Sequence, residues 1–384
     1  MAGKADSLLP AEIVPAFRPL LPTAAQLLPY LQRIDVARLY SNHGPLAEEL
    51  EARLRSALKL SNAYLLTANS GTSALVGGIL ATSGRANSAR PYALCPAYTF
   101  IGTASALQQC GYRPHLVDID QASWQLDPQR LLDHPLLGQV GMVMPVAPLG
   151  RPVPIEGWLK FQQQTGIAVV IDGAASIEAM LRDSARYVGE IPVALSFHAT
   201  KVFATGEGGA LLNSNPDILR KAYQTLNFGF MGSRESRTAS INGKMSEYHA
   251  AVGLACLDDW PQRIADYAAV NAGYREAFAA ADIQRPLHLG PDIASNYAVM
   301  ECRDAAESTA IASALGAAGI ESRLWYGLGL QQQPVLHDIG RDALPMTENL
   351  APRLLGLPMA PDLGLPTIKQ IVKTIRVFLE AKSL

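Results

Sequence analysis

Residues 196–201 read Ser-Phe-His-Ala-Thr-Lys, and residues 205–209 follow with Thr-Gly-Glu-Gly-Gly. The apolar runs 194–197 and 209–213 on either side have the length and composition of buried strands. Lys201 therefore stands between a strand end and a glycine-rich turn. Desolvation of an amine in such a place favours Schiff-base chemistry, and the glycines allow a ligand to approach the backbone. The alternative is a solvated surface lysine, as most lysines are.

Outside this stretch, short apolar runs alternate with helical patterns. Helices are predicted at residues 72–82, 154–164 and 216–227. The predicted strands are residues 63–67, 92–95, 115–117, 141–146, 167–172, 194–197 and 209–213. This alternation predicts an α/β domain with a largely parallel sheet.

The pattern changes in the last third of the chain. A long helix is predicted over residues 245–278. It is followed by a strand at 296–302, a helix at 305–318, a strand at 322–326 and a last helix at 367–381. We expect residues 1–260 to form a large domain with an N-terminal arm, and residues 261–384 a smaller α+β domain.

Composition excludes several classes of protein. The 384 residues carry 32 basic and 34 acidic side chains, a net charge of −2, which gives no basic field for nucleic acid or an anionic membrane. The uncharged run 63–84 is polar in its middle and unsuited to lipid, and residues 1–7 do not resemble a signal peptide. The four cysteines and seven histidines show no metal-ligand spacing, so we expect no metal. We expect a cytoplasmic protein.

Ligands of open α/β sheets bind at the carboxyl ends of the strands. Asn69-Ser-Gly-Thr-Ser73 follows one strand and opens a helix, where backbone N–H groups and hydroxyls suit a phosphate. A simple N-cap is the alternative for this segment. Asp172 ends the run 167–171, where a partly buried carboxylate needs a cationic or hydrogen-bonding partner. Its alternative is to cap the next turn.

These groups together suit pyridoxal 5′-phosphate (PLP). The cofactor needs an amine for its aldehyde, a cradle for its phosphate, and an acid that keeps its ring nitrogen protonated. Phe100, in Pro96-Ala-Tyr-Thr-Phe100 at another strand end, would provide an aromatic face. Taken alone, Phe100 also fits a core position.

The motifs resemble the DegT/StrS family of nucleotide-sugar aminotransferases. The similarity runs from Tyr40-Ser-Asn-His-Gly-Pro45 to Leu357-Pro-Met-Ala-Pro361, and its most specific part is the stretch around Lys201. Ser70-Gly-Thr-Ser-Ala74 and Asn242-Gly-Lys-Met-Ser-Glu247 support it. The resemblance implies the fold-type-I PLP architecture, a mostly parallel seven-stranded sheet between helices plus a smaller α+β C-terminal domain.

The resemblance also implies residue roles. Lys201 would form the Schiff base and Asp172 would pair with the pyridine nitrogen. Phe100 would stack on the ring. Asn242 would reach the phosphate in the neighbouring subunit, which implies a homodimer with shared active sites. The residues expected at the cofactor phosphate in the same subunit are Gly71, Thr72, Ser73 and Ser196.

The sequence departs from the family pattern near the substrate. Ala175 and Ala147 replace residues that are usually polar, and the segment 327–330 reads Gly-Leu-Gly-Leu. Lys244 replaces an arginine that often meets a substrate carboxylate, and a lysine lacks the bidentate fork. The residues expected at the substrate are His198, Lys244 and Tyr326.

The resemblance implies an aminotransferase that moves an amino group from L-glutamate to a keto-sugar nucleotide, with ping-pong kinetics. A PLP-dependent sugar dehydratase, a cyclitol aminotransferase and a non-catalytic regulatory relative are the alternatives. The dehydratases lack the lysine found here at position 201. No G-x-G-x-x-G follows the first strand, which excludes a dinucleotide-dependent oxidoreductase.

Overall fold

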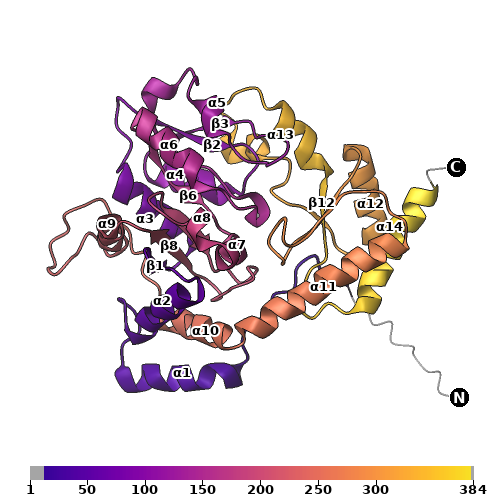
Figure 1. The fold of residues 1–384 in the computed structure, drawn as a ribbon, viewed down its shortest axis with the longest axis horizontal. Coiled ribbons are helices and arrows are strands. Elements are labelled where there is room, and N and C mark those ends of the chain that lie inside the picture. Colours follow the sequence, from indigo (N-terminus) through magenta and orange to yellow (C-terminus); the bar gives the residue numbers. More distant parts are fainter. Residues whose placement is uncertain (1–12, 382–384) are drawn as a thin grey trace, which may run out of the picture.

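The computed structural model describes residues 13–381, and its larger part is built around one sheet (Figure 1). β5 and β6 are two segments of a single extended stretch, because the Val170 amide donates to the Val143 carbonyl at 3.2 Å and the Asp172 amide to the Pro145 carbonyl at 2.9 Å. They join two four-stranded groups into one sheet of seven strand positions. In sheet order the strands are β1 (Tyr64–Ala68), β8 (Gly209–Asn213), β7 (Val193–Ser196), β6 (Ile171–Asp172) with β5 (Ala168–Val169), β4 (Val140–Val143), β2 (Tyr92–Pro96) and β3 (Arg113–Val117).

The sheet is mostly parallel, as predicted. Only β8 runs antiparallel to its two neighbours, β1 and β7. Successive strand residues enter two different cores: Ala194 and Leu211 belong to one, Leu195 and Leu212 to the other. A sheet buried on both faces explains why these strands read as continuous apolar runs rather than as alternating ones.

Helices cover both faces of the sheet. α3 packs against β7, β8, α4 and α9, and α2 packs against α10 and β1. The bounds in this part are α1 (Ala24–Ala37), α2 (Pro45–Ala57), α3 (Gly71–Thr82), α4 (Ile101–Gln109), α5 (Pro128–Leu131), α6 (Ile155–Thr165), α7 (Ile177–Arg182), α8 (Ser184–Tyr187), α9 (Pro216–Leu226) and α10 (Glu247–Asp258).

The prediction of one helix over residues 245–278 is wrong. The segment contains α10 and then α11 (Trp260–Ala280), which Asp259 separates. Pro261 stands in the first turn of α11. Proline has no N–H to continue an earlier helix and restricts the residue before it, so it starts a helix more readily than it continues one. In Figure 1 α11 then runs diagonally away from α10 toward α14.

The smaller sheet is antiparallel throughout. Its order is β11 (Arg323–Leu324), β12 (Leu354–Leu357), β10 (Ala298–Glu301) and β9 (Leu287–His288). α12 (Ala305–Ala317) and α14 (Leu365–Ala381) pack together beside it, and α13 (Pro345–Leu350) precedes β12. The predicted strands 296–302 and 322–326 are shorter in the structure, and β12 was not predicted.

The beginning of the described chain also joins this smaller part. Val14 forms a parallel bridge with Ile320, and Phe17 forms one with Met359. Residues 1–12 of the predicted arm lie outside the described residues, and the boundary at residue 260 stays a prediction. Within residues 13–381, no helix is both long and apolar enough to cross a membrane.

Candidate active site

Lys201 lies in the loop that follows β7. Glycines make this loop compact: Gly206 has a φ of +85°, and a Cβ on Gly209 would come within 2.7 Å of the Gly71 nitrogen. The Lys201 Nζ is half-buried and donates a hydrogen bond to the Tyr297 hydroxyl at 3.1 Å. The turn thus places the lysine amine inside the molecule and brings the loop against the start of α3.

Asp172 ends β6, the strand next to β7, and only 6% of its surface is exposed. Its carboxylate accepts a hydrogen bond from the Thr103 hydroxyl at 2.7 Å and a longer one from the Ala174 amide at 3.2 Å. Burial raises the pKa of Asp172, although these two donors and the charge of Lys201 lower it. A buried carboxyl with so few donors is suited to a cationic partner.

The start of α3 contacts the end of β7. A Cβ on Gly71 would come within 2.8 Å of the Ser196 Cβ, so only glycine permits this approach. Ser70 caps the helix by accepting a hydrogen bond from the Ser73 amide at 3.0 Å. The N-cap reading of this segment is therefore confirmed. The cap leaves other first-turn N–H groups without an intrahelical partner, which is the feature that attracts an anion.

Phe100 is not a core residue. It stands at the N-cap of α4 with 64% of its surface exposed. A Cβ on Gly102 would lie 3.2 Å from the Phe100 ring and 3.6 Å from the Thr72 hydroxyl oxygen, so these side chains are neighbours. An exposed ring beside the first turn of α3 is available to a planar ligand.

Asn242 and Lys244 form a second group near the same helix start. The Lys244 Nζ donates to the Asn242 Oδ1 at 2.8 Å, and the Asn69 side chain donates to the Asn242 carbonyl at 3.0 Å. Burial lowers the pKa of Lys244, whose amine lies 4.3 Å from the centre of the Phe228 ring. Burial and the Lys244 charge lower the pKa of His43 to about 4.

The other two predicted substrate residues differ in exposure. His198 is exposed, and its ring is 2.8 Å from the Thr200 hydroxyl within its own loop. The hydroxyl of Tyr326 accepts a hydrogen bond from the Leu149 amide at 2.9 Å. Burial raises the pKa of Tyr326 well above its ordinary value, with Tyr297 and Asp172 among the neighbouring groups that act on it. Tyr326 also packs against the cluster of buried residues that contains Tyr297, the residue that the Lys201 amine contacts.

Several residues of the site were not predicted. Thr103 follows Phe100 by one helical turn and had no motif to mark it. Tyr297 lies in the predicted strand 296–302, where an aromatic residue is unremarkable. Tyr98 is fully buried with a hydroxyl that has no partner among the described residues, and its ring centre is 5.1 Å from that of Tyr326. All three are recognised only by their contacts in the folded structure, and the spacing of residues along the sequence does not reveal such contacts.

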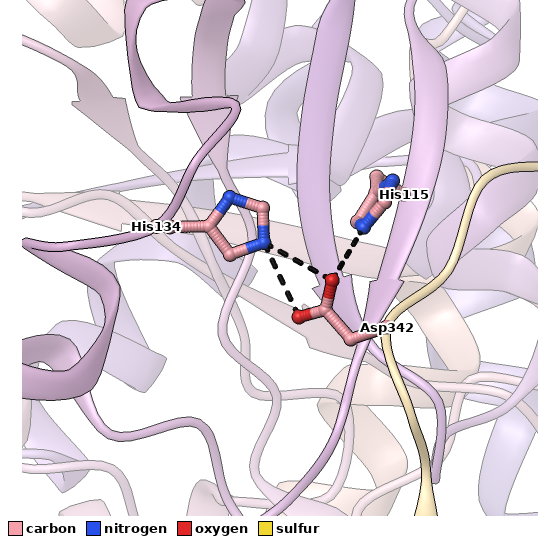
Figure 2. Close-up of side chains that lie close together, drawn as sticks. All are labelled: His115, His134 and Asp342. Atoms are coloured by element: carbon pink, nitrogen blue, oxygen red, sulfur yellow. Dashed lines mark hydrogen bonds and ion pairs between the residues drawn. The ribbon is translucent and has the colours of Figure 1, made fainter.

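A separate cluster joins His115, His134 and Asp342 (Figure 2). Asp342 lies 2.8 Å from the His115 Nε2 and 3.2 Å from the His134 Nε2. The Leu136 amide donates to the His134 Nδ1, so the proton of a neutral His134 ring is on Nε2 and points to the carboxylate. A metal on that Nε2 would require the opposite tautomer. The cluster instead clamps residues 340–342 to β3, where backbone bonds also hold them.

Comparison with known proteins identifies the family. The model of the DegT/DnrJ/EryC1/StrS aminotransferase family matches residues 24–376. The chain belongs to this family. As a DegT/StrS protein it is an aminotransferase by family, and its fold is the fold type I that was predicted.

Three relatives illustrate the breadth of this DegT/StrS likeness. Protein Rv3402c of Mycobacterium tuberculosis is 31% identical over 363 residues, which cover 91% of this chain and 87% of that protein. A dTDP-4-amino-4,6-dideoxy-D-glucose transaminase of Shigella dysenteriae is 31% identical over 242 residues, 63% of this chain and 64% of that one. The crystal structure of DesI, determined with its TDP-sugar product, superimposes with a TM-score of 0.83 at 26% identity and covers 97% of this chain and 95% of DesI.

Proposed function

We propose that this chain is a PLP-dependent aminotransferase that transfers an amino group from L-glutamate to a keto-sugar nucleotide, as a homodimer with shared active sites. The observation that carries the proposal is the shared location of three groups: the buried carboxyl of Asp172 ends β6, the Lys201 amine follows the neighbouring strand β7, and the N-terminus of α3 contacts the end of β7. Relatives that act on dTDP- and UDP-sugars support the nucleotide-sugar class of acceptor.

The residues present fit PLP. Asp172 is a buried carboxyl with few donors, which suits a protonated ring nitrogen. The close contact of Gly71 with Ser196 puts the first turn of α3 beside a hydroxyl, which suits a phosphate. Phe100 offers an exposed face. In this proposal the phosphate is held by Gly71, Thr72, Ser73 and Ser196, with Asn242 reaching across from the partner subunit.

When bound, PLP supplies an electron-withdrawing ring that stabilises negative charge at the substrate carbon. Asp172 would keep the ring nitrogen of the bound cofactor protonated. The Lys201 amine would take the proton from the Cα of glutamate and hold it for return, and it would act in the opposite direction on the keto acceptor. Lys244 meets a substrate carboxylate as a point charge. In this proposal His198 and Tyr326 would contact the substrate.

The proposal is tested by the visible absorption spectrum of the purified protein with PLP, before and after addition of L-glutamate. We expect a visible band that disappears with glutamate and is absent in Lys201→Ala. Lys160→Ala is the matched control, because Lys160 is an exposed lysine paired with Glu156 on the surface of α6. A band that does not respond to glutamate would refute the donor, and no band after addition of PLP would favour a non-catalytic relative.

A further inference from the structure

Tyr297 is the partner of the lysine amine. Among residues 13–381 the Lys201 Nζ has one hydrogen bond, to the Tyr297 hydroxyl at 3.1 Å. Only 5% of the Tyr297 surface is exposed. Its ring centre lies 5.1 Å from that of Trp325, edge to face, and 6.1 Å from that of Phe17. Phe17 and Trp325 also contact each other, with ring centres 5.4 Å apart, so they pack together against the Tyr297 ring and define the position of its hydroxyl.

A buried carboxylate holds the segment that carries Tyr297. Glu178, on α7, accepts hydrogen bonds from the Ser295 amide and the Ser295 hydroxyl, both at 2.7 Å. The Asn271 side chain donates to the Ser295 carbonyl at 3.1 Å. A carboxylate this deeply buried is tolerated only because both oxygens are satisfied. Ser295, two residues before Tyr297 in the chain, is thereby anchored to α7 and α11.

A second link connects the tyrosine segment directly to the lysine loop. The Asn296 side chain donates to the Thr200 carbonyl at 2.8 Å. Asn296 and Thr200 are the residues immediately before Tyr297 and Lys201. The Asn296–Thr200 and Tyr297–Lys201 bonds join two consecutive pairs of residues, so the two segments are held together at the reacting amine.

We propose that Tyr297 is a positioning residue for Lys201, and that Glu178 and Asn296 fix Tyr297 for this role. A lysine amine sits on a flexible four-carbon chain and must return to one position each time it moves a proton. A phenol hydroxyl can accept a hydrogen bond from an ammonium group and donate one to a neutral amine. Tyr297 therefore holds the amine in both protonation states. The inference rests on the proposed function, since it assigns Lys201 the proton transfers.

The first measurement uses the apoprotein, so it does not depend on PLP or glutamate. The rate at which trinitrobenzenesulfonate modifies Lys201 is followed by peptide mass spectrometry. Tyr297→Phe removes only the hydroxyl and frees the amine, so we expect labelling of Lys201 to become several-fold faster. Tyr274→Phe is the control, because Tyr274 is a buried tyrosine whose hydroxyl donates to the Pro358 carbonyl instead.

The second measurement uses the PLP-loaded enzyme. Tyr297→Phe should lower kcat about tenfold, the effect of one lost hydrogen bond, and leave the KM for glutamate within about twofold. Asn296→Ala, which keeps the hydroxyl but loses the link to Thr200, should shift labelling and kcat in the same directions. Labelling of Tyr297→Phe at the wild-type rate, or an unchanged kcat, would overturn the inference. Faster labelling in an enzyme that is inactive with every amino donor would count against the proposed function alone.

Discussion

Thr103→Val offers a quantitative test of how Asp172 is controlled. The Thr103 hydroxyl is fully buried and makes the shortest hydrogen bond to the Asp172 carboxylate, at 2.7 Å. Valine has nearly the same shape but no hydroxyl. A hydrogen bond to a charged group contributes about 1.5–3 kcal/mol, so we expect PLP to bind roughly 10- to 100-fold more weakly at neutral pH.

The pKa of Asp172 determines the direction in which Thr103→Val shifts the pH dependence of PLP affinity. The Thr103 hydroxyl lowers the pKa of Asp172 against the effect of burial, so its removal raises that pKa further. Because the ionised carboxylate is the form that pairs with a protonated ring nitrogen, PLP affinity is lost as the pH falls through this pKa. The loss should begin at a higher pH in Thr103→Val than in the wild type.

The assay is a titration of apoprotein with PLP, followed by visible absorption at a series of pH values. Thr309→Val is the control, since within the described part of the chain the exposed Thr309 hydroxyl bonds to the Ala305 carbonyl alone, in α12. An affinity for PLP within about threefold of wild type, with an unchanged pH profile, would refute the role given to the Thr103 bond.

Three further outcomes are expected. Asp172→Asn should raise the Tm of the apoprotein at about pH 7, because burial raises the pKa of Asp172 above its unfolded value and the ionised form therefore opposes folding. The gain in Tm should shrink toward about pH 4, where the carboxyl of the unfolded chain becomes protonated. A Tm that falls at neutral pH would contradict this prediction. Glu247→Ala should lower the free energy of unfolding in urea by about 2–3 kcal/mol, because the buried Glu247 carboxylate accepts two backbone N–H bonds at the start of α2. A change below about 0.5 kcal/mol would count against this role. His115→Ala should speed proteolysis near residue 340 while EDTA leaves the wild-type Tm unchanged; a Tm lowered by EDTA would show that the cluster of Figure 2 holds a metal.

The large sheet could be predicted because its strands are short apolar runs buried on both faces. The strand at residues 209–213 was placed with its observed bounds, and the start of α12 was placed correctly. The break between α10 and α11 was missed, because an apolar helical pattern continues across it and only Pro261 marks it. The bounds of the shortest strands were not predicted accurately, because a strand of two paired residues has almost no periodicity in the sequence.

The candidate site was predicted only as far as its local motifs reach. Lys201 and Asp172 follow apolar strand patterns, so their place at the carboxyl edge of the sheet can be predicted from the sequence. Thr103 and Tyr297 complete their surroundings from α4 and from the segment before β10, and neither has a local pattern. His115 and His134 contact Asp342 although more than 200 residues of chain separate them from it. Contacts of this kind depend on how the elements pack, which spacing along the chain does not encode.

The central claim is that the Lys201 amine is the group that binds PLP covalently. The direct measurement is borohydride reduction of the PLP-loaded wild-type protein, followed by digestion and peptide mass spectrometry. The account predicts one phosphopyridoxyl group per chain, attached to Lys201, and none in Lys201→Ala. Attachment to any other lysine, or no attachment to a protein that has bound PLP, would contradict it.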